Sequence, residues 1–243
     1  MNELKTLKII EPGSEENALL CNYIKERFSN EGTLNILEAG CGQKWSLDLK
    51  GLRYMLTGVD LDRESLQLRK EQKGDLHKMI LGDLRTISLK ENEYDIIYNS
   101  FVLEHIEGAG ILLDNFLKWL RPGGIIVLKI PDRDSVFGFL ARLTPFSLHV
   151  FYKRYVEKKP NAGRSGYDPF PTVYEKVVSR KGIHRYCDKH GLAIMLEFGM
   201  NWYLKSFGKL SVFLRIFTKI IELVSLGTLK SDHDNLIFVL QKS

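Results

Sequence analysis

The stretch NILEAGCGQKWSLDLKGLRYMLTGVDLD, residues 35–62, decides the fold of this chain. Two apolar runs end in acidic residues, Glu38 and Asp60, and a glycine turn of Gly40, Cys41 and Gly42 lies between them. This pattern is typical of a buried parallel strand that leads into a turn where a ligand can approach the backbone closely. A nucleoside-sized cofactor is the ligand that such a turn predicts.

The spacing between the turn and the second acid narrows the choice of cofactor. Asp60 follows Gly42 by 18 residues, so its carboxylate is expected beside the turn, where it can accept hydrogen bonds from a ribose. A dinucleotide site would have the pattern G-x-G-x-x-G, but Trp45 stands at the third glycine and Glu38 would repel a pyrophosphate. S-adenosylmethionine carries an ammonium and a sulfonium group instead, and an acid near its amino-acid end is favourable.

At these residues the chain resembles the class I S-adenosylmethionine-dependent methyltransferases, in particular the type 11-like branch that acts on small molecules. The first motif of that family reads roughly E/D-x-G-x-G-x-G; Glu38, Gly40 and Gly42 match it, and Lys44 replaces the third glycine. YDIIYNSFVLEHI (residues 94–106) and LRPGGIIVLKIP (residues 120–131) also resemble the family. The resemblance has clear motifs over residues 14–132 and rests on the order of the elements beyond them.

The alternation of apolar runs and helical segments predicts an α/β fold with a doubly wound parallel sheet. Strands are expected at about 34–39, 54–60, 77–83, 94–100, 125–131, 192–199 and 234–242. Helices are expected at about 14–28, 64–72, 111–120 and 179–190, with a short or irregular helix at 44–52. The resemblance implies a seven-stranded Rossmann-like methyltransferase fold, with the last strand antiparallel between the fifth and sixth, as a single domain over residues 1–243.

Two segments break this alternation. Residues 132–179 mix aromatic and basic residues without a clear period and contain several prolines, which predicts a lid-like insertion of short helices and loops. Residues 203–230 predict a second, amphipathic helical insertion before the last strand. Its apolar residues at helical spacing are Phe207, Leu210, Phe213, Leu214, Phe217, Ile220, Ile221 and Val224, with Lys205, Lys209 and Lys219 away from them. The helical part, 205–224, can meet a membrane surface peripherally, pack inside the protein or form a homodimer.

Composition and charge further limit the class of protein and the kinds of partner that the sequence predicts. The chain has 243 residues, of which 44% are hydrophobic and 27% charged, as in an ordinary globular protein. Its three cysteines are widely separated and predict neither a disulfide framework nor a zinc site. No run reaches the ~20 apolar residues of a membrane-spanning helix, so we expect a cytoplasmic protein, with peripheral membrane contact as an alternative. Residues 1–132 carry a net charge of −4 and residues 133–243 one of +9, which favours either an anionic partner or a solvated basic face.

The resemblance implies S-adenosyl-L-methionine as the cofactor, bound at the carboxyl ends of the strands. The residues that would bind it are Glu38, Gly40, Cys41, Gly42, Asp60, Leu61, Asp83, Leu84 and Ser100. By this resemblance, Glu38 and the backbone of the glycine turn hold the methionine end and Asp60 holds the ribose. Asp83 meets the adenine amino group, and Leu61 and Leu84 pack against the adenine ring.

Candidates for the catalytic base lie after the fourth strand and in the insertion. His105 follows the strand at the mouth of the expected site, where it could remove a proton from an oxygen or nitrogen acceptor. Related quinone-pathway O-methyltransferases hold a divalent metal with E-x-x-E-H here, but Phe101 replaces the first acid, so no metal is expected. His149 and Tyr152 are the leading candidates in the insertion. Further candidates there are Lys153, Tyr155, Arg164, Tyr167, Asp168 and Tyr174.

The leading interpretation is methyl transfer to a small, amphiphilic or lipid-like acceptor, with oxygen favoured as the acceptor atom. The basic second half also suggests an RNA methyltransferase, although no RNA-binding module is added to the domain. A third interpretation is a non-catalytic protein that binds S-adenosylmethionine at a membrane surface. DNA is not expected as a partner, because the N/D-P-P-Y motif is absent after the fourth strand.

Overall fold

The computed structural model describes residues 6–156, 158–164, 167, 169–206 and 211–243. Its strands are β1 (Lys8–Ile10), β2 (Leu34–Ala39), β3 (Tyr54–Asp60), β4 (Lys78–Leu81), β5 (Tyr94–Ser100), β6 (Leu120–Pro131), β7 (Ala193–Met200) and β8 (Asn235–Gln241). Its α-helices are α1 (Ser14–Arg27), α2 (Arg63–Gln72), α3 (Ala109–Trp119), α4 (Val136–Leu143), α5 (Phe146–Phe151), α6 (Arg180–His190), α7 (Trp202–Ser206) and α8 (Ser211–Val224). A 3₁₀ turn, η1 (Leu103–His105), and a π-helical turn, η2 (Tyr152–Val156), complete the elements.

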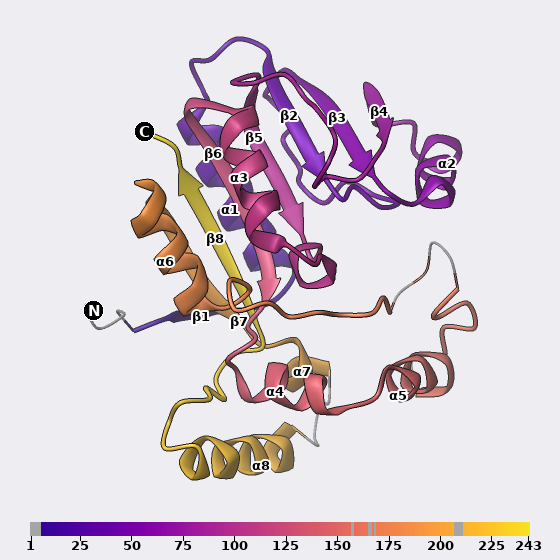
Figure 1. Cartoon of the computed structure of the whole chain (residues 1–243), viewed down its shortest axis with the longest axis vertical. Helices are drawn as coiled ribbons and strands as arrows, with labels where there is room; N and C mark the ends of the chain where they lie inside the picture. The colour runs from indigo at the N-terminus through magenta and orange to yellow at the C-terminus, as the bar shows by residue number, and fades with distance from the viewer. Residues whose placement is uncertain (1–5, 157, 165–166, 168, 207–210) are drawn as a thin grey trace.

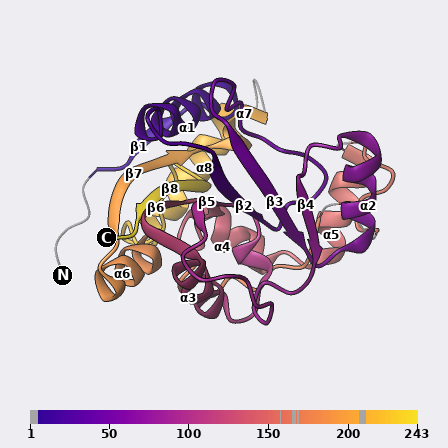
Figure 2. The same ribbon diagram turned by 90° about the horizontal axis from the view of Figure 1, so that it is seen from above.

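The strands form one sheet in the order β1-β7-β8-β6-β5-β2-β3-β4, with helices on both faces (Figures 1 and 2). Only β8 is antiparallel to its neighbours, β6 and β7, while the other described pairs are parallel. The predicted doubly wound α/β fold and its antiparallel last strand are therefore confirmed. The strand order reverses between β2 and β5, and this switch point is where open α/β sheets bind ligands.

The sheet has eight strands, so the prediction of seven was wrong. The additional strand, β1, pairs in parallel with residues 198–200 of β7 at the sheet edge. Three residues are too few to show a strand period, and only the pairing with β7 identifies them as a strand. The start of β6 also differs, because it begins at Leu120 rather than Ile125 and accommodates the Pro-Gly-Gly segment through a register shift against β5.

The prediction of a short or irregular helix over residues 44–52 was also wrong. Residues 43–53 form turns and extended backbone. Leu47 and Leu49 are buried while Asp48 between them is exposed, so the buried side chains follow the period of an extended chain. Trp45 packs edge-on against Tyr98 of β5, with ring centroids 5.3 Å apart. The glycine turn is therefore followed by an extended segment and lacks the support of a helix.

Each face of the sheet has its own hydrophobic core. On one face, buried residues of the α1 segment pack against buried side chains of β2 and β6. The residues of the α1 segment are Leu20, Ile24 and Phe28. On the other face, α3 and α6 contribute buried residues such as Phe116 and Ile183. These two layers hold the parallel strands in register and bring their carboxyl ends to one edge.

A layer of short helices lies beyond the carboxyl ends of the parallel strands. Figure 1 shows α4, α5, α7 and α8 in this layer, below the sheet, with α5 at its outer end under α2. The chain then returns to the sheet as an extended segment that leads into α6. No helix among the described residues combines the length and apolar character that a membrane crossing requires.

A buried histidine connects the end of β6 to the segment before β8. His233 Nε2 lies 2.8 Å from Asp132 Oδ2, and its Nδ1 lies 2.7 Å from Asp232 Oδ1. Desolvation alone would lower the pKa of His233, but the hydrogen bonds to the two carboxylates outweigh it and raise this pKa to about 9. The imidazole is therefore protonated at neutral pH and bridges two acids at the base of the helical layer.

We expect the His233→Gln variant to be less stable in a pH-dependent way. The pKa in the folded protein, about 9, is above the ordinary 6.5, so the contribution is complete below pH 6.5 and is lost as the pH rises through 9. The shift corresponds to about 3 kcal/mol at low pH. Urea denaturation of both proteins between pH 6 and pH 10 measures it. A stability difference that stays constant over this range would contradict the prediction.

Candidate functional site

The glycine turn at the end of β2 combines one closed and one open position. Gly40 has φ +76°, and a Cβ there would meet Val102 Cγ2 at 2.3 Å, so Val102 fills this side of the turn. Gly42 has φ +50°, and no atom lies within 4 Å of the place of its Cβ. Both positions favour glycine for their backbone conformation, but only Gly42 leaves space in which another molecule can contact the backbone.

The N–H groups of the turn are already used within the protein. Gly40 and Cys41 both donate to the carbonyl of Val59, at 2.8 and 3.1 Å. Gly42 donates to Asp60 Oδ2 at 2.8 Å, and the other oxygen of Asp60 accepts from the Asp62 N–H at 2.9 Å. Among the described residues, no backbone N–H donates to the carbonyls of Gly40 or Gly42. The turn therefore offers acceptors, which suit the ammonium group of a methionine end.

A buried arginine, which the sequence did not reveal as a site residue, organises this turn. Arg69 of α2 is fully buried, and its Nη2 lies 2.7 Å from Glu38 Oε2 at the end of β2. Its Nη1 donates to the carbonyl of Cys41 at 2.6 Å, and its Nε donates to Asp75 Oδ1 at 2.9 Å. One guanidinium thus connects β2, the glycine turn and the loop before β4. Glu38 contacts this cation, rather than facing an open site.

Two titratable groups near Arg69, the carboxyl of Glu38 and the thiol of Cys41, are buried, and burial changes their pKa values. Burial raises the pKa of Glu38, and the hydrogen bond and charge of Arg69 at 2.7 Å oppose this rise, so the carboxylate form of Glu38 depends on Arg69. Burial also raises the pKa of the Cys41 thiol to about 12, so this side chain is not a nucleophile at neutral pH. The predicted role of Cys41 is therefore limited to its backbone.

The ends of β3 and β4 present different surfaces. Leu61 is 69% exposed directly after Asp60, as a residue that packs against a bound ring should be. Asp83 is paired with Arg85, whose Nη2 lies 2.6 Å from Asp83 Oδ2, and these hydrogen bonds lower the pKa of Asp83. Leu84 is buried in the core between the sheet and α3, so its side chain is not available at the surface.

The end of β5 carries a strained backbone. Ser100, predicted to lie at the cofactor site, is half-buried at the last position of the strand. Phe101 follows with φ +56°, a rare conformation for a bulky residue, and Lys129 of β6 lies over its ring. Before them, the buried side chain of Asn99 donates to the carbonyl of Ala39 at 2.8 Å. Asn99, which the sequence did not indicate, connects β5 to β2 at the switch point.

The return segment of the insertion is fastened to the turn after β5. The N–H of Val173 donates to the Glu104 carbonyl at 2.7 Å, and His105 Nδ1 lies 2.7 Å from the carbonyl of Pro171. Glu175 accepts hydrogen bonds from the N–H groups of Gly108 and Ala109, at 2.6 and 3.1 Å, where α3 begins. The segment therefore holds His105 in a fixed orientation.

The hydrogen bond to Pro171 determines the form of His105. A carbonyl only accepts, so Nδ1 carries the proton and Nε2 keeps its lone pair. Burial lowers the pKa of His105, which makes the neutral ring the dominant form at neutral pH. Glu104 Oε1 lies 3.7 Å from Nε2. Burial raises the pKa of Glu104 to about 8, so two neutral titratable groups lie side by side here.

An aromatic cavity of about 160 Å³ lies between the ends of β6 and β8 and the helical layer. Phe137 and Tyr203 stack within its wall, with centroids 5.3 Å apart, and Tyr174 and Trp202 also line it. Tyr174 is connected to η1, because its N–H reaches the Glu104 carbonyl at 3.3 Å. A larger hollow of about 490 Å³ lies beside β1 and α8, at the opposite edge of the sheet from β3. Tyr174 is thus the lining residue that connects the smaller cavity to the turn that carries Glu104 and His105.

The structure places the other predicted catalytic residues in the insertion. His149 Nε2 lies 3.3 Å from the carbonyl of Ala141 in α4, and Tyr152 begins η2 and is exposed. Both lie on the α5 end of the layer, apart from the end of β5 in Figure 1. Lys153, Tyr155 and Arg164 follow in the same outer part, and Tyr167 lies beyond them. Asp168 lies outside the described residues, and so do Phe207, Lys209 and Leu210 of the amphipathic segment.

Arg69 could have been noticed in the sequence, although its role could not. It follows Leu66 by three residues on a helix that otherwise has few apolar residues, so it shares the buried face of α2. Charge on a buried face requires a partner, but nothing in the spacing indicates Glu38 and Asp75. Among the residues that the structure describes, no group of three or more His, Cys, Asp or Glu side chains is placed to hold a metal ion.

The open glycine turn, the acid at the end of β3 and the switch point between β2 and β5 together form the place where an open α/β sheet binds its ligand. A family described as a methyltransferase domain matches residues 37–128. This segment contains Glu38, Gly40 and Gly42, so it matches a methyltransferase domain of the kind that the resemblance of the first motif predicted.

Curated relatives are similar over part of their length. A probable S-adenosylmethionine-dependent methyltransferase of Mycolicibacterium smegmatis is 26% identical over 41% of this chain and 38% of its own. A ubiquinone biosynthesis O-methyltransferase of Nitrobacter winogradskyi is 25% identical over 71% of this chain and 64% of its own. The chain thus spans less than two thirds of both relatives.

Solved structures share the fold. The crystal structure of a putative S-adenosylmethionine-dependent methyltransferase from Listeria monocytogenes is similar with a TM-score of 0.58 and 12% identity. The similarity covers 94% of this chain and 98% of that one. At this identity the comparison concerns the fold, including the helical layer, and does not identify an acceptor.

We expect Arg69→Met to destabilise the protein by about 3–5 kcal/mol, because it leaves Glu38 buried without its partner. The double variant Glu38→Gln/Arg69→Met should recover part of this loss, since it no longer buries an unpaired carboxylate. Arg63→Met, on the exposed side of the same helix, is the matched control and should change stability little. Urea denaturation measures all three variants. Equal losses for Arg63→Met and Arg69→Met would show that the buried network is not the cause.

Proposed function

We propose that this protein transfers a methyl group from S-adenosylmethionine to an oxygen atom of a small or amphiphilic acceptor. The observation that carries this proposal is a neutral histidine, held in one orientation by the Pro171 carbonyl, whose neighbour Glu104 is hydrogen-bonded to Tyr174 in the wall of an aromatic cavity. One relative is named as a ubiquinone biosynthesis O-methyltransferase, which supports oxygen as the acceptor atom.

The residues around the turn fit the proposed cofactor. The carbonyls of Gly40 and Gly42 offer acceptors to an ammonium group, and the space beside Gly42 admits a ligand close to the backbone. Asp60 would hold the ribose and Leu61 would cover the adenine. When bound, S-adenosylmethionine supplies an electrophilic methyl group on a sulfonium centre. Asp83 would meet the adenine amino group after part of its pairing with Arg85 is exchanged for the ligand.

His105 is the residue that we propose as the general base. Its Nδ1–H is held by the Pro171 carbonyl, so Nε2 is left to accept the proton of an acceptor hydroxyl. The lowered pKa keeps Nε2 unprotonated at neutral pH. When His105 receives the proton, its positive charge favours ionisation of the neighbouring Glu104, which is neutral before the step and can then release its own proton to solvent.

The aromatic cavity is the proposed site for the reacting part of the acceptor. Its volume of about 160 Å³ is similar to the ~150 Å³ of an engineered cavity that holds benzene. A ring bound between Tyr174 and the stacked pair of Phe137 and Tyr203 would face the end of β5. This arrangement supports a hydroxylated ring as the acceptor, with any longer apolar portion outside the cavity.

Asp60→Ala should weaken the binding of S-adenosylmethionine by about tenfold or more, because charge-assisted hydrogen bonds to the ribose are lost. Isothermal titration calorimetry of the folded variant measures the change. Asp188→Ala, an exposed carboxylate on α6, is the control and should bind as the unmodified protein does. Unchanged affinity in Asp60→Ala would contradict the assignment of β3, and a folded unmodified protein without measurable binding would contradict the function itself.

His105→Gln should lower the rate of methyl transfer by about 100-fold or more while leaving cofactor affinity unchanged. The acceptor can be found by mass spectrometry of metabolite and lipid extracts incubated with the protein and deuterated-methyl cofactor. In the unmodified protein, activity should persist at pH 6.5 and be lost only at lower pH, because the pKa of His105 lies below its ordinary value of 6.5. His149→Gln is the matched comparison. If it lowers the rate and His105→Gln does not, the base lies in α5 instead.

A further inference from the structure

Helix α8 presents an apolar face that the fold does not cover. Seven of its apolar side chains are between 52% and 78% exposed: Val212, Phe213, Ile216, Phe217, Ile220, Leu223 and Val224. Leu226, just after the helix, is 91% exposed. Continuous apolar surface of this kind is unusual on a protein without a partner, and marks a site of interaction.

The opposite face of α8 anchors the helix to the protein. Thr218 is the buried residue of the helix, and Leu214 and Ile221 beside it are half-buried. This face packs on α4 and α7. Because the helix is already attached through one side, the apolar residues of its other side are not needed for its own packing.

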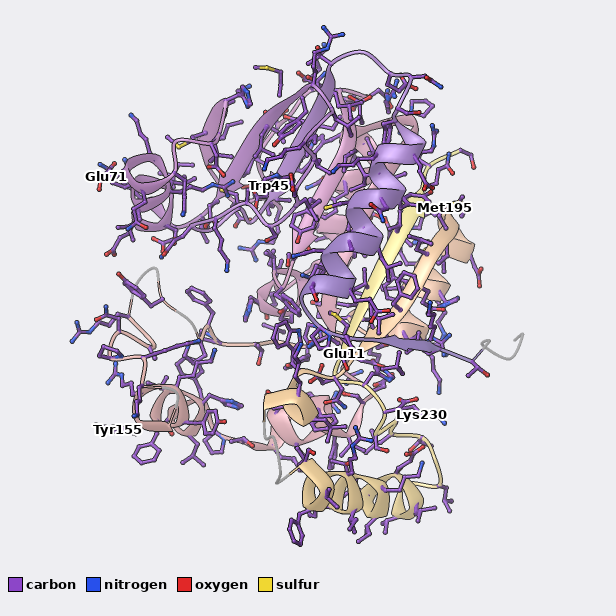
Figure 3. All side chains as sticks on the ribbon, turned by 180° about the vertical axis from the view of Figure 1, so that it is seen from behind. Glu11, Trp45, Glu71, Tyr155, Met195 and Lys230 are labelled. Atoms are coloured by element: carbon purple, nitrogen blue, oxygen red, sulfur yellow. The ribbon has the colours of Figure 1, made fainter. Side chains whose placement is uncertain are left out.

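Helix α5 and the η2 turn, apart from α8 at the other end of the same layer, carry a second group of exposed apolar residues. Phe146, Leu148, Phe151 and Tyr155 are between 41% and 69% exposed. Figure 1 shows α5 and α8 in the layer beyond the carboxyl ends of the strands, and Figure 3 shows Tyr155 on the outer side of α5. The exposed apolar residues of α8 and α5, with Leu226, are called the apolar face below.

Basic side chains border the apolar face. Arg215 and Lys219 lie next to it on α8, and both are exposed. Lys230 follows on the segment that leads from α8 toward β8 (Figure 3). The acid of α8, Glu222, pairs with Lys219 at 2.8 Å, accepts a hydrogen bond from Ser231 and lies 4.0 Å from Lys230 Nζ, so one acid is set against the three basic side chains. The charge around the face is therefore positive, in agreement with the net +9 of residues 133–243.

We propose that the apolar face docks onto the surface of a bilayer that contains anionic phospholipids. Phenylalanine and branched side chains on one side of a helix, with basic residues at its border, are the arrangement of a helix that lies in the interface of a membrane. Arg215, Lys219 and Lys230 would meet the phosphate groups while the apolar residues enter the region between headgroups and acyl chains.

The charge distribution favours a bilayer over a second copy of this chain. In a symmetric dimer the same patch covers itself, which would bring Arg215 and Lys219 near their copies without additional acids to pair them. Anionic lipids remove this repulsion and also accommodate two apolar groups on separate helices. A bilayer therefore satisfies both the apolar and the basic part of the surface.

Docking in this orientation has a consequence that rests on the proposed function. The apolar face is the outer surface of the helical layer, and the inner surface of that layer lines the aromatic cavity through Phe137 and Tyr203. An acceptor embedded in the lipid would then approach the aromatic cavity from the side of the helical layer.

Vesicle flotation with the full chain tests the docking surface without requiring catalysis. The protein is expected to float with vesicles of phosphatidylcholine and phosphatidylglycerol, and to bind at least about tenfold less to phosphatidylcholine alone. Phe213→Ser/Phe217→Ser should lower binding to the mixed vesicles by more than about tenfold, since both side chains are already exposed and enter the interface only when docked. Ile111→Ser, 56% exposed on α3, is the matched control and should bind normally.

A second variant separates the charge from the apolar contact. Arg215→Gln/Lys219→Gln should lose the preference for anionic vesicles, whereas Lys181→Gln on α6 should keep it. The proposal is overturned if the unmodified protein does not float, or if it floats equally well after the Phe213→Ser/Phe217→Ser change. It is also overturned if sedimentation shows a dimer that this change dissociates while flotation is unaffected. Cofactor binding measured on the same variants separates a failure of docking from a failure of the proposed function.

Discussion

The buried guanidinium of Arg69 is the interaction on which the cofactor end of this protein depends. The extended segment after the glycine turn provides no helix to hold the turn in place, so its position is determined by hydrogen bonds from elsewhere. Arg69 supplies them from α2 and reaches Glu38, the Cys41 carbonyl and Asp75. A cation without water is costly unless it is paired, and here the carboxylates that neutralise it lie on both sides of the turn. The same contacts of Arg69 therefore pair its charge and hold the glycine turn in position.

A second constraint lies at the end of β5, where the insertion returns to the sheet. The carbonyl of Pro171 orients His105, and Glu175 begins α3, so the same short segment supports both the candidate base and the helix beside it. Burial then has opposite effects on the pKa values of the two neighbours. It lowers the pKa of His105 and raises that of Glu104, and both changes favour the neutral form. At neutral pH the side chains of His105 and Glu104 are therefore both uncharged.

The helical layer connects these features to the surroundings of the protein. Its inner side forms the aromatic cavity, and its outer side carries the apolar face and the basic residues at its border. The sheet and its two cores need neither of these surfaces for their own stability. The basic second half of the chain therefore supplies the surfaces that we propose contact the acceptor and the membrane. The first half supplies the residues that we propose bind the cofactor.

The sequence by itself determined the class of fold, because parallel strands and glycine turns leave local patterns: apolar runs that end in Glu38, Asp60 and Asp83, separated by helical segments. It also indicated an amphipathic helix near the end of the chain. It could not show β1, whose three residues are a strand only through pairing with β7, nor the role of Arg69, whose partners are brought together by folding. Nor could it decide which side of the amphipathic helix is covered, since a helical period is the same for a helix that packs inward and one that faces outward. Tertiary structure decided these points because each depends on contacts between segments far apart in the chain.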